Sequence, residues 1–98
     1  MAVIDELRVE DNPAKHRYEA RAGERLLGFV TYREEPGRIT LVHTEVEPEL
    51  EHRGVASQLV AATLDDVRAR GLSVVPVCPF VRAFIRRHPE YAGLVGAR

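Results

Sequence analysis

The sequence predicts an α+β domain with a mixed, mainly antiparallel, five-stranded sheet. Two observations support this prediction. The first half of the chain alternates apolar and polar residues in short runs that end at turn-forming residues, which is typical of an antiparallel meander. After Gly54 the apolar residues recur at steps of three and four, which indicates an amphipathic helix, and a short β-branched strand and a second helix follow. A strand–helix–strand order implies a right-handed crossover, so the last two strands should be parallel neighbours.

Turn-forming residues separate four strands in the first half of the chain. Asp11–Pro13, Gly23 and Pro36–Gly37 supply the breaks, because proline and glycine favour turns over a continuous ladder. The third strand is the most apolar and should lie near the centre of the sheet. The four predicted strands are Leu7–Glu10, His16–Arg21, Arg25–Tyr32 and Arg38–Val46.

The second half predicts helix, strand, helix. The first helix runs from Gly54 and stops at Gly71, a residue suited to a C-terminal cap. The segment Leu72–Cys78 is too short and too β-branched for a helix, and Pro76 within it argues for an edge strand or an interrupted ladder. Pro79 can open a second helix that ends near Pro89, whereas residues 90–98 show no clear pattern.

Bulk properties limit the classes of function. Ninety-eight residues make one domain, 1–98, and a net charge of −1 gives no general attraction to nucleic acid or to an anionic membrane. No run of apolar residues is long enough to span a bilayer, and Met1–Glu6 lacks the pattern of a signal peptide, so we expect a cytoplasmic protein. The single cysteine, Cys78, excludes an internal disulfide, and the histidine spacing indicates no metal site. We expect a monomer.

The junction between the fourth strand and the first helix has the outline of a phosphate-binding site. Gly54 lets backbone approach a ligand closely, and the N-terminus of the following helix offers unpaired N–H groups and a positive dipole end to an anion. The alternative is that Gly54 only allows a tight turn between the strand and the helix. The carboxylates of Glu45, Glu47, Glu49 and Glu51 could attract a cationic amine, or could simply be solvated.

Three segments together resemble a known family. They are His43–Val46, Glu51–Val60 and Val75–Val81 running on to Arg87–Tyr91. This combination resembles the Gcn5-related N-acetyltransferase superfamily, and more closely its small stand-alone branch of YjdJ-type N-acetyltransferase-like proteins. The resemblance implies a minimal acyl-CoA N-acyltransferase fold, with acetyl-CoA as cosubstrate and a primary amine as acceptor.

The resemblance also implies which residues would serve the reaction. It places the chemistry at Cys78 and His43, with Glu45 as a rival base. One departure is Glu51, which stands where the superfamily motif has Gln or Arg, so Arg53 and backbone N–H groups must contribute more to holding a diphosphate. The cofactor-binding residues implied are Val46, Arg53, Gly54, Val55, Ala56, Ser57, Pro79 and Phe80.

The roles of Cys78 and His43 have more than one interpretation. Cys78 precedes a helix N-terminus, which favours a thiolate, so it could act as a nucleophile that carries acetyl or as the acid that protonates departing CoA. It could also be a small buried hydrophobic residue. His43 suits a general base near neutral pH, and strand alternation places Leu41, His43 and Glu45 on one face. A strand histidine without a role is the alternative.

Two rival functions remain open on the sequence. A module that binds or senses acyl-CoA with little turnover would use the same loop, and the small size of the chain favours it. A protein-interaction domain that has lost the cofactor is the other, and Glu51 is the one feature in its favour. Arg82, Arg86 and Arg87 could meet a phosphate or an acidic partner, or form a solvated face.

Overall fold

The computed structural model describes residues 7–51 and 53–96, so that Met1–Glu6, His52 and the last two residues lie outside it. Its centre is a five-stranded sheet with the order β1-β2-β3-β4-β5. Each of the first four strands is antiparallel to its neighbour, and β5 is parallel to β4. This arrangement confirms the predicted fold class. The strands are β1 (Leu7–Asn12), β2 (Arg17–Ala22), β3 (Arg25–Glu35), β4 (Arg38–Val46) and β5 (Ser73–Pro76).

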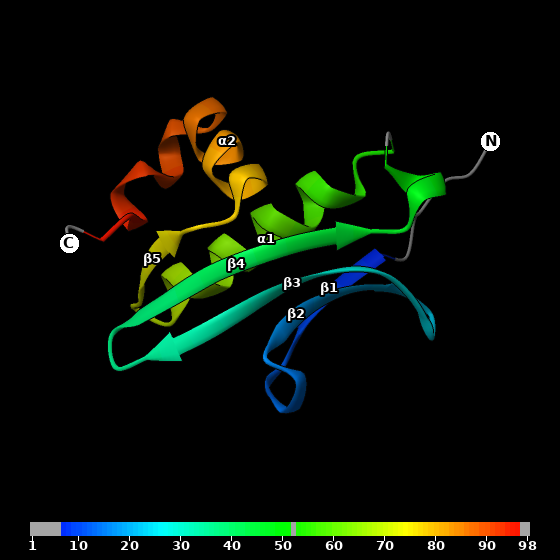
Figure 1. The fold of residues 1–98 in the computed structure, drawn as a ribbon, viewed down its shortest axis with the longest axis horizontal. Helices are drawn as coiled ribbons and strands as arrows, with labels where there is room; N and C mark the ends of the chain where they lie inside the picture. Colours follow the sequence, from blue (N-terminus) through cyan, green and yellow to red (C-terminus); the bar gives the residue numbers. More distant parts are fainter. Residues whose placement is uncertain (1–6, 52, 97–98) are drawn as a thin grey trace.

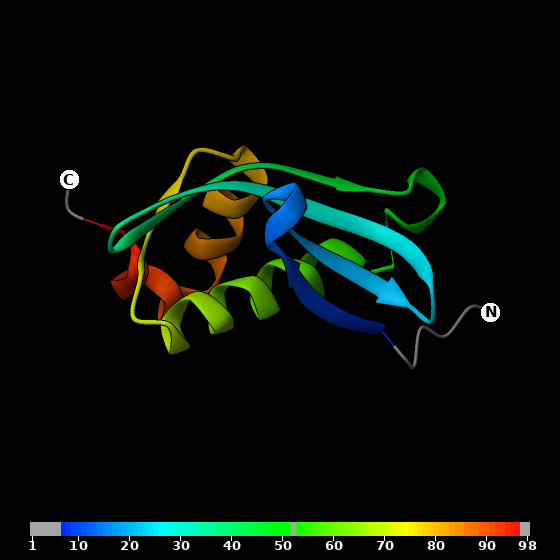
Figure 2. The ribbon, with the colours of Figure 1, turned by 90° about the horizontal axis from the view of Figure 1, so that it is seen from below.

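Helices α1 (Val55–Ala69) and α2 (Pro79–Arg87) lie on the same side of the sheet, and the described residues form no α-helix on the other side (Figures 1 and 2). Helix α1 buries one stripe of side chains against the sheet, as its three- and four-residue period predicted. None of the described helices is long and apolar enough to cross a membrane. The buried residues of α1 are Val55, Leu59, Val60, Thr63, Leu64 and Val67.

Gly71 ends α1 as the sequence predicted. Its φ of +73° places it in the left-handed region that glycine adopts without strain. The N–H of Gly71 donates to the carbonyl of Arg68 and the N–H of Leu72 donates to that of Val67. This pair of bonds is the Schellman motif, which satisfies carbonyls left open by the last turn.

The ends of several elements differ from the predicted ones. Strand β3 extends to Glu35, and β5 ends at Pro76 because Val77 and Cys78 turn away toward α2. Proline has no N–H to continue a ladder, so it suits this terminal position. The tail is more ordered than its sequence indicated, because Val95 forms a bridge with Val74 of β5. Three 3₁₀ helices complete the chain: η1 (Pro13–Lys15), η2 (Pro48–Leu50) and η3 (Pro89–Leu94).

Strand β4 contains a bulge at Val42. Thr31 pairs with His43 and the next residue, Tyr32, pairs with Leu41, so Val42 has no partner on β3. A bulge shifts the alternation of side chains by one residue. The prediction that Leu41 shares a face with His43 and Glu45 is therefore wrong: Leu41 is fully buried toward the helices, whereas His43 is exposed on the helix-free face.

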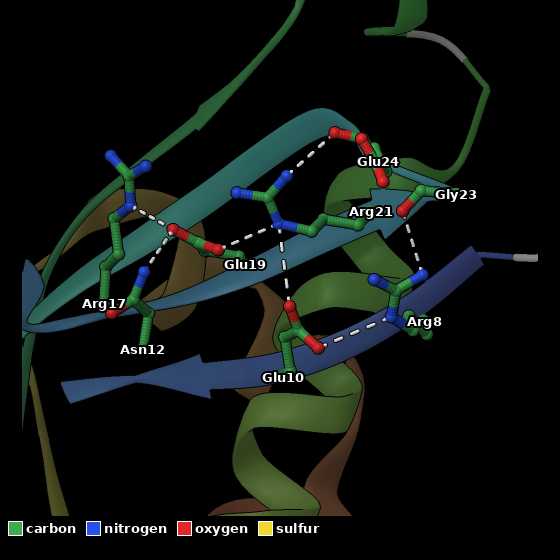
Figure 3. A network of polar contacts seen from close by, with 8 residues as sticks. All are labelled: Arg8, Glu10, Asn12, Arg17, Glu19, Arg21, Gly23 and Glu24. Carbon is green, nitrogen blue, oxygen red and sulfur yellow. Dashed lines mark hydrogen bonds and ion pairs between the residues drawn. The ribbon is translucent and has the colours of Figure 1, made fainter. Parts of the chain in front are cut away.

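A buried carboxylate ties β1 and β2 together on the helix-free face (Figure 3). Glu19 is only 1% exposed, and it accepts hydrogen bonds from Asn12 at 3.0 Å, from Arg17 at 2.8 Å and from Arg21 at 3.0 Å. Burial opposes ionisation, but these donors outweigh it and hold the pKa of Glu19 below its usual value. The donors therefore favour the ionised form of Glu19, and its role is structural.

Polar contacts also hold the sheet to α1 on the helix side. The hydroxyl of Tyr18 donates to Asp66 at 2.5 Å and accepts a bond from Arg70, whose other nitrogen pairs with Glu34. Burial and the hydrogen bond to the carboxylate raise the pKa of Tyr18 well above its usual value. The phenol is thus held in its neutral, donating form, and these contacts fix the end of α1 on β2 and β3.

We predict that Glu19→Gln lowers the free energy of unfolding by about 1–3 kcal/mol at neutral pH, because it removes a charge that two guanidinium groups need. The folded pKa of Glu19 lies below its unfolded pKa, so this stabilisation is present above the unfolded value and is lost as pH falls through the folded value. The difference in free energy of unfolding between Glu19→Gln and the wild type should therefore disappear below about pH 4. Urea denaturation at several pH values measures it.

The matched control is Glu10→Gln, since Glu10 lies on the same face but its side chain is 46% exposed. Glu10→Gln should change the free energy of unfolding by no more than about 0.5 kcal/mol. A cost for Glu19→Gln that persists unchanged in acid would show that shape rather than charge matters at this position.

Gly28 on β3 allows an unusually close approach of β4. A Cβ at this position would lie 2.6 Å from the carbonyl oxygen of Glu45 and 2.9 Å from Cγ2 of Val46. Such distances force backbone to move. We predict that Gly28→Ala lowers the free energy of unfolding by about 1–3 kcal/mol in urea denaturation, because it displaces the end of β4.

Gly93→Ala provides the comparison, because a Cβ there would meet nothing within 4 Å and its φ is not positive. That variant should change stability by no more than about 0.5 kcal/mol. Equal stability of the two variants would contradict the close approach at Gly28.

Candidate functional site

The parallel strands β4 and β5 separate halfway along β4. Their pairing ends at Leu41, whose carbonyl accepts the N–H of Val77 at 3.1 Å and the N–H of Cys78 at 3.0 Å. From this point the chain after β5 turns toward α2, while β4 continues to Val46 (Figure 1). The edge of β4 beyond Leu41 thus has no strand beside it among the described residues, and we call this opening the fork.

A cavity of about 310 Å³ opens beside this edge of β4 on the helix side. Five residues from four parts of the chain line it: Thr44 and Val46 of β4, Glu51, Ala56 of α1, and Phe80 of α2. Three residues from the predicted cofactor set, Val46, Ala56 and Phe80, therefore meet here. Glu51 lines the same cavity, so the one residue that departs from the expected motif faces the proposed site.

The first turn of α1 lies at one end of this region. Gly54 has a φ of +80°, no side chain caps the helix N-terminus, and a Cβ on Gly54 would meet open space. The side chain of Val55 is buried, so only its backbone can face a ligand, whereas Ser57 is exposed. Arg53 is also exposed, and its N–H donates to the carbonyl of Leu50. A helix N-terminus of this kind favours an anion.

Cys78 lies at the fork as the residue that precedes α2. It is 3% exposed, Pro79 follows it at the first position of the helix, and its Sγ lies 3.3 Å from Oγ1 of Thr44. Thr44 is the one polar side chain that the structure places within hydrogen-bonding distance of this thiol among the described residues. Sequence reasoning missed Thr44, although it stands between His43 and Glu45 and must point to the opposite face.

His43 and Glu45 form a pair on the helix-free face. Nε2 of His43 lies 3.3 Å from Oε1 of Glu45, and both side chains are about 60% exposed (60% and 63%). The prediction that they share a face is confirmed. Since Thr44 contacts Cys78 and strand residues alternate, His43 points away from the side that holds Cys78. The structure therefore places the two candidate catalytic residues on opposite sides of the fork.

Two arginines contribute in ways that the sequence did not indicate. Arg25 of β3 pairs with both Glu47 and Glu49, so one positive charge is shared by two carboxylates of the acidic stretch. Arg82 of α2 donates to the carbonyl of Val77 at 2.9 Å and lies 3.4 Å from that of Pro76. These bonds satisfy carbonyls that leave the ladder where β5 ends. Arg82 is thus a structural residue of the fork as well as part of the exposed side of α2.

Comparison with known proteins identifies a family to which most of this chain is similar. The sequence model of the GCN5-related N-acetyl-transferase family matches residues 17–94. Comparison with curated proteins finds no match. The closer resemblance to the YjdJ-type branch stays a prediction.

Two solved structures share the fold. The solution structure of a GCN5-like protein from Staphylococcus aureus, described as a candidate N-acetyltransferase, has a TM-score of 0.71 at 21% identity, and the match covers 96% of this chain and 92% of that one. The crystal structure of a ribosomal-protein-alanine N-acetyltransferase from Brucella melitensis has a TM-score of 0.53 at 24% identity, over 84% of this chain and 62% of that one. The family match spans most of the chain and includes the fork, both helices and the glycine turn, so this protein belongs to the GCN5-related N-acetyltransferase family and is an acetyltransferase.

Proposed function

We propose that this protein transfers acetyl from acetyl-CoA to a primary amine. One observation carries the proposal: β4 extends past the end of β5 to Val46 with an open edge, and a cavity of about 310 Å³ lies between this edge and the first turns of both helices. An extended chain with amide groups can bond to an open strand edge as a further strand would. The pantetheine arm of CoA is such a chain.

The diphosphate of CoA binds, in this proposal, at the N-terminus of α1. Backbone N–H groups of Val55, Ala56 and Ser57 and the positive helix end provide the attraction, with Arg53 beside them. Val46, Ala56 and Phe80 form the apolar wall of the cavity, with Pro79 at the start of α2. Glu51 opposes the negative cofactor, so the affinity of this site is lower than its backbone geometry alone would give.

The acceptor approaches the fork from the helix-free face. The nitrogen of the neutral amine attacks the thioester carbonyl carbon, and His43, with Glu45 beside it, accepts the proton that this nitrogen loses as the bond forms. As the carbon–sulfur bond breaks, the thiol of Cys78 gives its proton to the departing CoA sulfur. Thr44 lies 3.3 Å from Sγ of Cys78 and can orient that proton. Glu45 serves as the base if His43 does not.

The alternative role for Cys78 is a nucleophile that carries the acetyl group. A nucleophilic thiol needs a base to take its proton. The described neighbour of Cys78 is a hydroxyl, and His43 points to the other side of the strand. These contacts favour the role of acid over that of nucleophile. A cytoplasmic location is part of the proposal, and a chain with one cysteine is compatible with it because it needs no disulfide.

A second candidate function is an acyl-CoA-binding or sensing module with little turnover. Two observations favour it: Glu51 lines the cofactor cavity, and Cys78 is buried beside a neutral hydroxyl. Binding without release of CoA thiol from a panel of primary amines would support this function over transfer.

We predict that acetyl-CoA raises the melting temperature of the protein, because a ligand that binds only the folded state stabilises it. We predict further that Glu51→Gln tightens the dissociation constant by about two- to fivefold, since it removes a like charge from the cavity. Isothermal titration calorimetry measures the dissociation constant of acetyl-CoA for the wild type and for Glu51→Gln.

Glu24→Gln is the control for net charge, because Glu24 is exposed in the turn between β2 and β3. It should bind acetyl-CoA as the wild type does. No thermal shift at near-millimolar acetyl-CoA would contradict the proposed cofactor site, whereas equal gains from both variants would show only a general charge effect.

We predict that Cys78→Ala and Cys78→Ser each lower kcat by about 10- to 100-fold while the affinity for acetyl-CoA changes little, because the proton donor is lost but the binding surface is kept. Release of CoA thiol measures turnover. Val81→Ala, a truncation of a buried residue of α2, controls for loosened packing and should lower stability more than kcat.

Mass analysis after incubation with acetyl-CoA separates the two roles of Cys78. Direct transfer predicts no covalent acetyl group. An acetyl group found on wild type and absent from Cys78→Ala would instead establish the nucleophile. Unchanged kcat in both cysteine variants would show that Cys78 only contributes to packing.

A further inference from the structure

A second hollow lies on the helix-free face, beside the proposed acceptor side of the fork. It has a volume of about 190 Å³, and it is lined by residues of β3, the end of β4 and the start of η2. Leu26, Phe29 and Pro48 give it apolar walls, and Glu45 and Glu47 add two carboxylate side chains. We call this hollow the acidic groove.

The register of the sheet places the acidic groove on the same face as His43. Phe29 pairs directly with Glu45, and Thr31 pairs with His43, so these four residues lie on one side of β3 and β4. The intervening Val30 is fully buried on the helix side. A molecule that reaches His43 from this side can therefore extend along β4 into the acidic groove without crossing the sheet.

The charges around the acidic groove are unbalanced. Arg25 is shared between Glu47 and Glu49, while Glu45 has only His43 beside it. The three carboxylates of Glu45, Glu47 and Glu49 face the one guanidinium of Arg25, so negative charge is in excess in this region. Arg17 lies 4.5 Å over the ring of Phe29, and because it shares the buried Glu19 with Arg21, it offsets part of this negative charge but not all of it. The groove is thus suited to a positive charge.

The size of the acidic groove limits the kind of molecule that can carry a positive charge into it. A strand rises by about 3.3 Å per residue, so Glu45 lies roughly 7 Å along β4 from His43, where the reacting amine is placed. This span matches a short alkyl chain between two amines. The volume of about 190 Å³ is smaller than a typical pocket for a drug-sized ligand and suits an aliphatic arm rather than a peptide.

We infer that the acidic groove binds the second ammonium group of the acceptor, so that the preferred acceptor is a short aliphatic diamine. The neutral amine lies at His43, the methylene chain packs on Phe29 and Leu26, and the distal ammonium lies beside Glu45 and Glu47. The inference rests on the proposed acetyl transfer, and it adds the class of the acceptor.

The test compares putrescine with n-butylamine, which has the same carbon chain but one amine. We expect a value of kcat/KM that is about three- to tenfold higher for putrescine at low salt, because exposed ion pairs contribute modestly. The preference should shrink as salt is added. Glu47→Gln should lower the ratio of the two kcat/KM values, whereas Glu45, which stays in the groove, should keep that ratio above one.

Glu35→Gln is the matched control, since Glu35 is also an exposed glutamate paired with an arginine, Arg38, but lies at the far end of β3. It should keep the wild-type ratio. Equal kcat/KM values for putrescine and n-butylamine in the wild type would overturn the inference while leaving acetyl transfer intact, and so would a stronger preference for a lysine-containing peptide.

A binding measurement tests the groove independently of turnover. Titration of the whole protein with putrescine, followed by amide NMR shifts, should perturb Phe29 and residues 45–47, and n-butylamine should do so much less. If no amine is acetylated, the proposed function fails, but these shifts still test the groove. The absence of any such perturbation by putrescine overturns the inference.

Discussion

The carbonyl group of Leu41 is the point on which the rest of the site depends. It accepts the N–H groups of both Val77 and Cys78, so the chain leaves β5 at a fixed place and carries Cys78 beneath the open edge of β4. A ladder that continued beyond Leu41 would fill this edge with backbone and leave no room for an extended ligand. The bulge at Val42 occurs at the same place, and bulges increase local twist. The bulge toward β3 and the departure of β5 thus occur at neighbouring residues of β4, Val42 and Leu41.

Two polar networks stabilise the sheet and its contact with α1. On the helix-free face, Glu19 holds the first two strands through Arg17 and Arg21, and on the helix side Tyr18, Asp66 and Arg70 fasten the end of α1 to the sheet. Both networks lie away from the fork. The fork itself is supported by main-chain bonds and by Arg82, which caps carbonyls that β5 leaves open. Strong side-chain anchors thus surround a site made largely of backbone.

The sequence predicts the sheet, its order and both helices because alternation, turn residues and the glycine stop are local signals. The apolar period after Gly54 and the Schellman motif at Gly71 are examples in which the residue pattern alone is sufficient. The bulge could not be predicted in this way, since Val42 is a β-branched residue that fits a regular strand equally well. Missing it placed Leu41 on the wrong face.

The candidate site could be predicted from the sequence only in part, for a related reason. Val46, Ala56 and Phe80 meet as expected because each lies at the end of a predicted element. The contact between Thr44 and Cys78 and the pairing of Arg25 with Glu47 and Glu49 join residues distant in sequence, and no local pattern encodes them. The faces of His43 and Cys78 likewise depend on how β5 turns away, which is a tertiary property.

The small size of the domain determines how the two faces of the sheet are used. Both described α-helices pack on one side, so that side supplies the apolar cavity and the helix N-terminus. On the opposite side the described residues form no α-helix that could wall in an acceptor, so the recognition groups described there come from the strands and the turn that follows β4 (Figure 2). Glu45 and Phe29 are cross-strand partners, so a carboxylate and an aromatic ring are held together by the ladder alone. A groove built from strand pairs is shallow, and it can discriminate acceptors by charge and chain length better than by detailed shape.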